Sequence, residues 1–190
     1  MNSGFLAEKE VHSIRPLWEQ VFAEDSKAFT EYYFENKAER NLVFTRMDGE
    51  DIVSMLHLAP YMTGRMESVC YIVGVATKEA YRRQGLMADM MKEALQFMRA
   101  EGQPFTFLMP AAEGIYYPYD FRFVYTRKQG EMCGENNDSN VEIREAKHED
   151  CGKLATFSNV FLKEHQVVAH RDAGYFEMFL AEQASQDGGI

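Results

Sequence analysis

The most constraining feature of this sequence is an apolar run that leads through a glycine-bearing loop into an amphipathic helix. Residues 68–76 are almost unbroken apolar, as in a strand buried on both faces of a sheet. After the loop that ends at Gly85, apolar residues recur over 86–98 at helical spacing. A further strand is predicted at 105–109. The chain therefore carries a β-α-β unit whose first strand is central in its sheet.

The segment before this unit predicts two helices and a hairpin. Apolar residues recur at helical spacing within residues 8–36 and are interrupted by the polar residues 24–26, which indicates two consecutive helices. Two β-type runs, 42–45 and 52–58, flank an Asp-Gly turn and predict a β-hairpin. Downstream of the β-α-β unit, residues 121–126 have the composition of a last strand.

The chain divides into two parts of unequal length. We expect a first domain at 1–130, a linker at 131–140 with few apolar residues, and a second part at 141–190. The second part repeats the order in which the chain begins, so it is predicted to be the opening of a second, similar unit. Its predicted elements are a short strand at 141–144 and helices at 149–165 and 172–184.

Composition excludes several kinds of partner. The formal charge of −10 would repel a nucleic acid backbone. Three cysteines with no close pairing favour a reducing cytoplasm, and His148, His165 and His170 are too scattered to give metal-ligand spacing. No apolar segment approaches the ~20 residues of a membrane span. We therefore expect a cytoplasmic protein without a metal, a membrane partner or a nucleic acid partner.

The loop before the predicted helix at 86–98 has the features of an anion site. Backbone N–H groups converge at a helix N-terminus, where the helix dipole also favours negative charge. Gly85 lets the backbone approach a ligand closely, and Arg82 and Arg83 add positive charge. The preceding apolar strand and the following amphipathic helix make a diphosphate site the favoured interpretation.

Two motifs in this region resemble those of the GNAT superfamily of N-acetyltransferases. VATKEAYRRQGLM, from Val75 to Met87, resembles the acetyl-CoA motif, and MPAAEGIYYPYDF, from Met109 to Phe121, resembles a second signature. The resemblance covers about residues 8–128 and implies an α/β (α+β) fold with a mixed, mostly antiparallel central sheet flanked by helices. Within the superfamily the chain is most similar to the enhanced intracellular survival group, which carries two tandem GNAT-like units.

The resemblance assigns roles to particular residues. Val75, Ala76 and Thr77 would pair their backbone with the pantetheine amides of acetyl-CoA, as an added strand does. Tyr116 would protonate the departing CoA thiolate, which a phenol with a pKa of ~10 can do at neutral pH. The residues implied to cradle the pyrophosphate are Arg83, Gln84, Gly85, Leu86, Met87 and Ala88.

The implied reaction is direct attack by the amine of a small molecule on the thioester, with acetyl-CoA as cosubstrate and no covalent enzyme intermediate. An aminoglycoside, a polyamine or a lysine-like amine is the implied acceptor. The amine needs a base, for which Glu113, His57 and Glu31 are candidates that no spacing distinguishes.

Two alternatives to the enzyme remain open at this point. One is an acyl-CoA-binding or interaction module without turnover, and the other is an assembly domain with an incidental glycine loop. An unfinished second unit should also leave apolar helix surface exposed within residues 149–184, which predicts self-association as a homo-oligomer.

Overall fold

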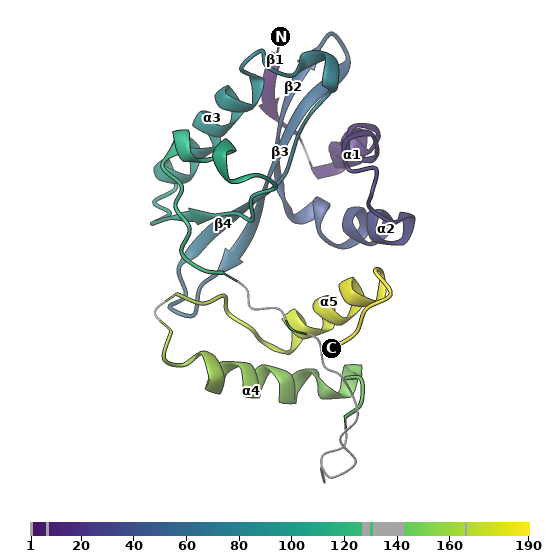
Figure 1. The fold of residues 1–190 in the computed structure, drawn as a ribbon, viewed down its shortest axis with the longest axis vertical. Coiled ribbons are helices and arrows are strands. Elements are labelled where there is room, and N and C mark those ends of the chain that lie inside the picture. The colour runs from purple at the N-terminus through teal and green to yellow at the C-terminus, as the bar shows by residue number, and fades with distance from the viewer. Residues whose placement is uncertain (1, 7, 127–129, 131–142, 166) are drawn as a thin grey trace.

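A five-stranded sheet organises the chain (Figure 1). The computed structural model describes residues 2–6, 8–126, 130, 143–165 and 167–190. The strands lie in the sheet in the order of the sequence, and all neighbours are antiparallel except the last pair, which is parallel. The predicted mixed, mostly antiparallel sheet is thus confirmed. The strands are β1 (Asn2–Phe5), β2 (Leu42–Asp48), β3 (Asp51–Met62), β4 (Ser68–Thr77) and β5 (Thr106–Phe107).

Helices cover both faces of this sheet. The pair α1 and α2 lies on one face and α3 on the other (Figure 1), with a separate apolar core on each side. The polar residues predicted to separate the first two helices include the N-cap residue of α2, Ser26. Its hydroxyl accepts a hydrogen bond from the N–H of Phe29 at 3.0 Å. The helices are α1 (Arg15–Val21), α2 (Lys27–Asn36), α3 (Leu86–Ala100), α4 (Cys151–Leu162) and α5 (Ala173–Ala184).

Three strand predictions differ from the structure. The strand expected at 105–109 is only the two residues of β5. Residues 121–126 form no strand, and Val124 is 93% exposed, because no neighbouring strand among the described residues pairs with this segment. Ile143 and Arg144 are not in a strand either, whereas 141–142 and the expected linker at 131–140 lie outside the described residues. Strand β1, which the sequence did not predict, pairs with β2.

The two C-terminal helices agree with the prediction and pack on each other through Cys151, Ala155 and Phe176. Helix α5 also contacts α2, where the Tyr32 hydroxyl donates to the carbonyl of Met178 at 2.7 Å. The segment before α5 is tied to the β3–β4 turn through the N–H of His170, which donates to the carbonyl of Met62 at 2.7 Å. These contacts hold α5 against the first part of the chain.

Among the residues that the structure describes, no helix has both the length and the apolar character that crossing a membrane requires.

Candidate active site

Strand β4 has an edge that its parallel neighbour leaves open. β5 pairs with β4 only at Cys70 and Tyr71, although β4 continues to Thr77. Over residues 72–77, therefore, β5 gives no ladder hydrogen bonds to this side of β4. Backbone groups on such an edge can bind an extended ligand in the way that an added strand is bound.

A β-bulge at Gly74 shapes the same part of β4. His57 lies opposite Val73 and Met55 lies opposite Ala76, so β4 has one more residue than β3 between these pairs. Gly74 has a φ of +60°, and a Cβ on it would lie 2.8 Å from Cζ3 of Trp18. Glycine is thus required here by both the backbone and the packing, and the bulge bends β4 where its edge is open.

The structure places the three residues predicted to bind pantetheine at the end of β4. The Ala76 carbonyl accepts a hydrogen bond from the Ser54 hydroxyl at 2.8 Å, and the Thr77 carbonyl accepts one from Nε of Arg82 at 3.2 Å. A carbonyl oxygen has two lone pairs, so the bond from Arg82 leaves the Thr77 carbonyl able to accept a second hydrogen bond. Arg82, which the sequence suggested as a charge for an anion, therefore also holds the end of the strand.

The predicted pyrophosphate residues form the N-terminus of α3. Gly85 is the N-cap residue with φ +85° and ψ −4°, and a Cβ built on it would meet no atom within 4 Å. The N–H groups of Leu86, Met87 and Ala88 belong to the first turn, whose donors have no partner within the helix. Arg83 also has a positive φ, +62°, in the exposed loop. Open space, backbone donors and a nearby guanidinium together suit a diphosphate.

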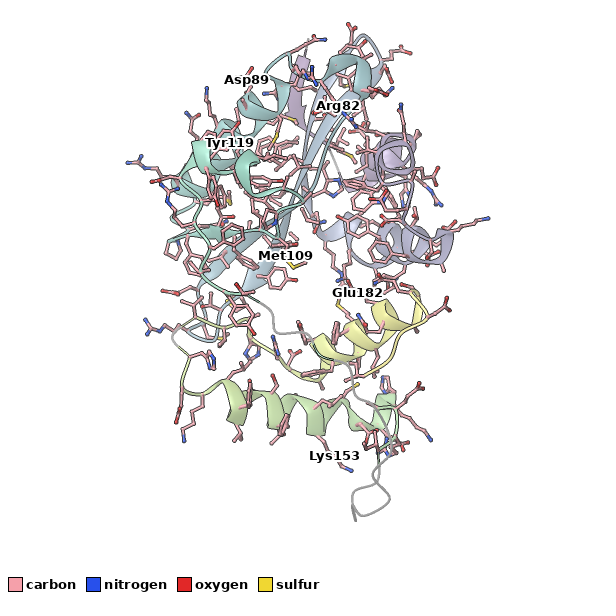
Figure 2. All side chains as sticks on the ribbon, viewed as in Figure 1. Arg82, Asp89, Met109, Tyr119, Lys153 and Glu182 are labelled. Atoms are coloured by element: carbon pink, nitrogen blue, oxygen red, sulfur yellow. The ribbon has the colours of Figure 1, made fainter. Side chains whose placement is uncertain are left out.

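Contacts with the β2–β3 hairpin hold this loop in place. The Tyr81 hydroxyl donates to Oδ2 of Asp48 at 2.8 Å, and Nζ of Lys78 donates to Oδ2 of Asp51 at 2.7 Å. Figure 2 shows Arg82 in the loop and Asp89 in the first turn of α3. The sequence alone does not reveal these anchoring residues, because the partners are some 30 positions apart and no motif joins them.

Tyr116 lies in the core between α3 and the sheet. Its side chain is 9% exposed, and its ring centroid is 6.0 Å from that of Phe121. Val75 and Met87 pack against the same core, so the structure brings one predicted residue from each of three segments together. Burial raises the pKa of Tyr116, which keeps the phenol protonated, and its hydroxyl has no hydrogen-bond partner among the described residues.

Two of the three candidate bases are already engaged. Nδ1 of His57 lies 3.0 Å from the Tyr33 hydroxyl, and burial lowers the pKa of His57 to about 3. Both oxygens of Glu31 accept hydrogen bonds from Arg15, at 2.8 and 3.0 Å, which lowers the pKa of Glu31. His57 is fully buried, so it cannot reach an amine in solution. The side chain of Glu113 lies outside the described part of the structure.

The residues that the structure describes include no group of histidine, cysteine, aspartate and glutamate side chains placed to hold a metal ion.

Many solved structures share this fold, and the following three do so at low sequence identity. A probable N-acyltransferase from Enterococcus faecalis V583 is 20% identical with a TM-score of 0.56; the match covers 62% of this chain but only 31% of that protein. An aminoglycoside acetyltransferase from an uncultured soil metagenomic sample is 17% identical over 70% of this chain and 98% of its own, with a TM-score of 0.53.

The third is a predicted acetyltransferase with acetyl-CoA from Clostridium acetobutylicum, which is 12% identical over 68% of this chain and 95% of its own, with a TM-score of 0.58. No curated protein matches the chain. The family model described as an acetyltransferase (GNAT) domain matches residues 5–124, which is more than half of the chain and includes the open edge of β4, Gly85 and Tyr116. The chain therefore belongs to the GNAT acetyltransferase family.

Proposed function

We propose that this protein transfers the acetyl group of acetyl-CoA to the primary amine of a small molecule. The observation that carries the proposal is the open edge of β4, which leads through one short loop to the left-handed Gly85 at the start of α3. A strand edge followed by a cluster of backbone donors matches a ligand with an amide-bearing arm and a diphosphate.

Each part of that arrangement has a proposed role. Val75, Ala76 and Thr77 bind the amide-bearing arm, and the residues from Arg83 to Ala88 hold the diphosphate. Acetyl-CoA supplies an activated acyl group as a thioester. The chain's contribution is to orient this group beside the amine, since holding two reactants together accounts for a large share of the rate of such transfers.

Tyr116 is the proposed proton donor. The amine nitrogen forms a bond to the thioester carbonyl carbon, and the bond from that carbon to sulfur breaks. The sulfur takes the Tyr116 proton, the nitrogen loses one proton to solvent, and the tyrosinate regains a proton from solvent. Burial supports this role because it raises the pKa of the phenol and keeps it protonated at neutral pH. Val75, which packs against the same core, brings the arm of the ligand toward the phenol.

We further propose that residues 141–190 begin a second GNAT-like unit, joined to the domain at 1–130, as in the enhanced intracellular survival group. The paired helices α4 and α5 support this division. Phe157, Val160 and Phe161 on α4 are each about two-thirds exposed, and such an apolar face favours contact with a further unit or a second copy of the chain.

A turnover assay tests the proposed function. The chain is incubated with acetyl-CoA and a panel of aminoglycosides, polyamines and lysine-like amines, and released CoA thiol is measured. Gly85→Glu should abolish release, because its carboxylate would occupy the space of the diphosphate. Gly102→Glu is the matched control, since Gly102 has a φ of +72° and open space at the opposite end of α3. Acetyl-CoA binding without thiol release with any amine would instead identify a binding module.

A further inference from the structure

Tyrosine side chains from α2, β3 and β4 lie within electrostatic reach of one carboxylate, that of Glu182 on α5. The rings of Tyr61, Tyr71 and Phe107 form a triangle with centroid distances of 5.9, 5.4 and 5.1 Å. Tyr32 on α2 and Glu182 on α5 complete what we call the tyrosine–glutamate cluster. Figure 2 shows Glu182 on α5 and Met109 just after β5. Four elements of the first part of the chain and one of the second therefore contribute to it.

The cluster already holds one ammonium group of the protein. Nζ of Lys37 forms an ion pair with Oε2 of Glu182 and lies 5.9 Å from the centroid of the Tyr32 ring. A carboxylate and the face of a tyrosine are the two kinds of group that bind an organic cation. The contacts of Lys37 thus show the chemistry that a second ammonium group would meet.

Lys37 uses only one of the two carboxylate oxygens of Glu182. No donor among the described residues binds Oε1 of Glu182, whose side chain is 24% exposed. Tyr61, Tyr71 and Phe107 are partly exposed as well, so a ligand can touch their rings. The cluster is therefore accessible on its aromatic side and has an unused acceptor.

The cluster is connected to the proposed site of acetyl transfer. The Tyr71 hydroxyl accepts a hydrogen bond from the backbone N–H of Met109, at the start of the segment that carries Tyr116. Burial raises the pKa of Tyr71, and the neighbouring Tyr116 and Glu182 raise it further. Tyr71 thus lies within electrostatic reach of both the proposed proton donor and the carboxylate.

We propose that the tyrosine–glutamate cluster binds the second, non-reacting ammonium group of a diamine acceptor, with Glu182 as the residue that selects diamines over monoamines. This inference rests on the proposed function. A carboxylate stabilises the protonated form of an amine, whereas the reacting amine must be neutral when it attacks. Glu182 is therefore suited to anchor the far end of the acceptor while the other amine reaches the thioester near Tyr116.

Calorimetric binding of 1,5-diaminopentane and 1-aminopentane to the purified chain in the presence of CoA tests this inference. Wild type should bind the diamine more tightly, and Glu182→Gln should weaken diamine binding about tenfold while changing monoamine binding little. Glu177→Gln is the matched control, because Glu177 lies on the same helix beside His148 and carries the same charge. Equal affinity of wild type for both ligands, or unchanged diamine binding by Glu182→Gln, would overturn the proposal.

Lys37→Met separates a lost contact from a loosened helix. It removes the cation that competes for Glu182, so diamine binding should become severalfold tighter, the opposite of the effect of Glu182→Gln. If α5 were merely displaced, both variants would weaken binding, and the proposal would be wrong. Failure of the proposed function would give a different result. The chain would not bind acetyl-CoA, but its affinity for the diamine would still change in these variants as predicted.

Discussion

Replacing Gly74 with alanine tests the structural basis of the bulge in β4. The new Cβ would lie 2.8 Å from Trp18 Cζ3 and 3.1 Å from His57 Cδ2, on a residue whose φ is +60°. The left-handed backbone costs about 1–2 kcal/mol for a residue with a Cβ, and overpacking a filled core costs about 1–3 kcal/mol more. We expect the free energy of unfolding, measured by urea denaturation, to fall by about 2–5 kcal/mol.

Gly49→Ala is the control for the backbone part of this loss. Gly49 has a φ of +63°, but a Cβ there would meet no atom within 4 Å, so only the cost of about 1–2 kcal/mol should remain. Combining Gly74→Ala with Trp18→Phe should recover part of the packing loss as a coupling energy. Equal destabilisation by Gly74→Ala and Gly49→Ala would refute the close packing of Gly74 against Trp18.

Three further predictions concern single side chains. Tyr116→Phe should lower kcat about 10²-fold or more with little change in KM for acetyl-CoA, as steady-state kinetics would show, and an undiminished kcat would exclude Tyr116 as the proton donor. Burial lowers the pKa of His57 to about 3, so below about pH 6.5 the unfolded state binds more protons than the folded state, and the free energy of unfolding decreases as the pH falls. In urea denaturation at several pH values, His57→Leu should reduce the dependence of the free energy of unfolding on pH by up to about 1.4 kcal/mol per pH unit. Hydrogen bonds from Arg144 hold the pKa of Asp150 well below its usual range, so Asp150→Asn should lower the thermal midpoint at neutral pH. The difference in thermal midpoint from wild type should shrink as the pH falls below about 3.9, and an equal difference at all pH values would contradict this prediction.

Local patterns were sufficient to predict most of the fold. Helical spacing located α1 to α5, and the Asp-Gly turn located the β2–β3 hairpin, because each of these signals lies within one short segment. The error at 121–126 has the opposite origin. β-Type side chains indicate that a segment can pair, but a strand also needs a partner at its edge, and none of the described residues supplies one.

The candidate site was predictable only in part. The motif around Gly85 marked the start of α3. The backbone N–H groups of the first turn of any helix point toward its N-terminus without an intrahelical partner, so locating the start of the helix also locates these hydrogen-bond donors. In contrast, the contact between Gly74 and Trp18 joins residues from a strand and a helix that are far apart in the sequence, and Glu182 meets Lys37 through the docking of α5. Such pairs depend on tertiary packing, which the periodicity of a single segment does not encode.

Calorimetric titration of wild type, Gly85→Glu and Gly102→Glu with acetyl-CoA tests the central claim most directly. We predict saturable one-to-one binding for wild type and Gly102→Glu and none for Gly85→Glu, because only Gly85 lies at the donors that begin α3. Folding of all three proteins is checked by circular dichroism. Unchanged binding by a folded Gly85→Glu variant, or no binding by wild type, would contradict the assignment of the acetyl-CoA site.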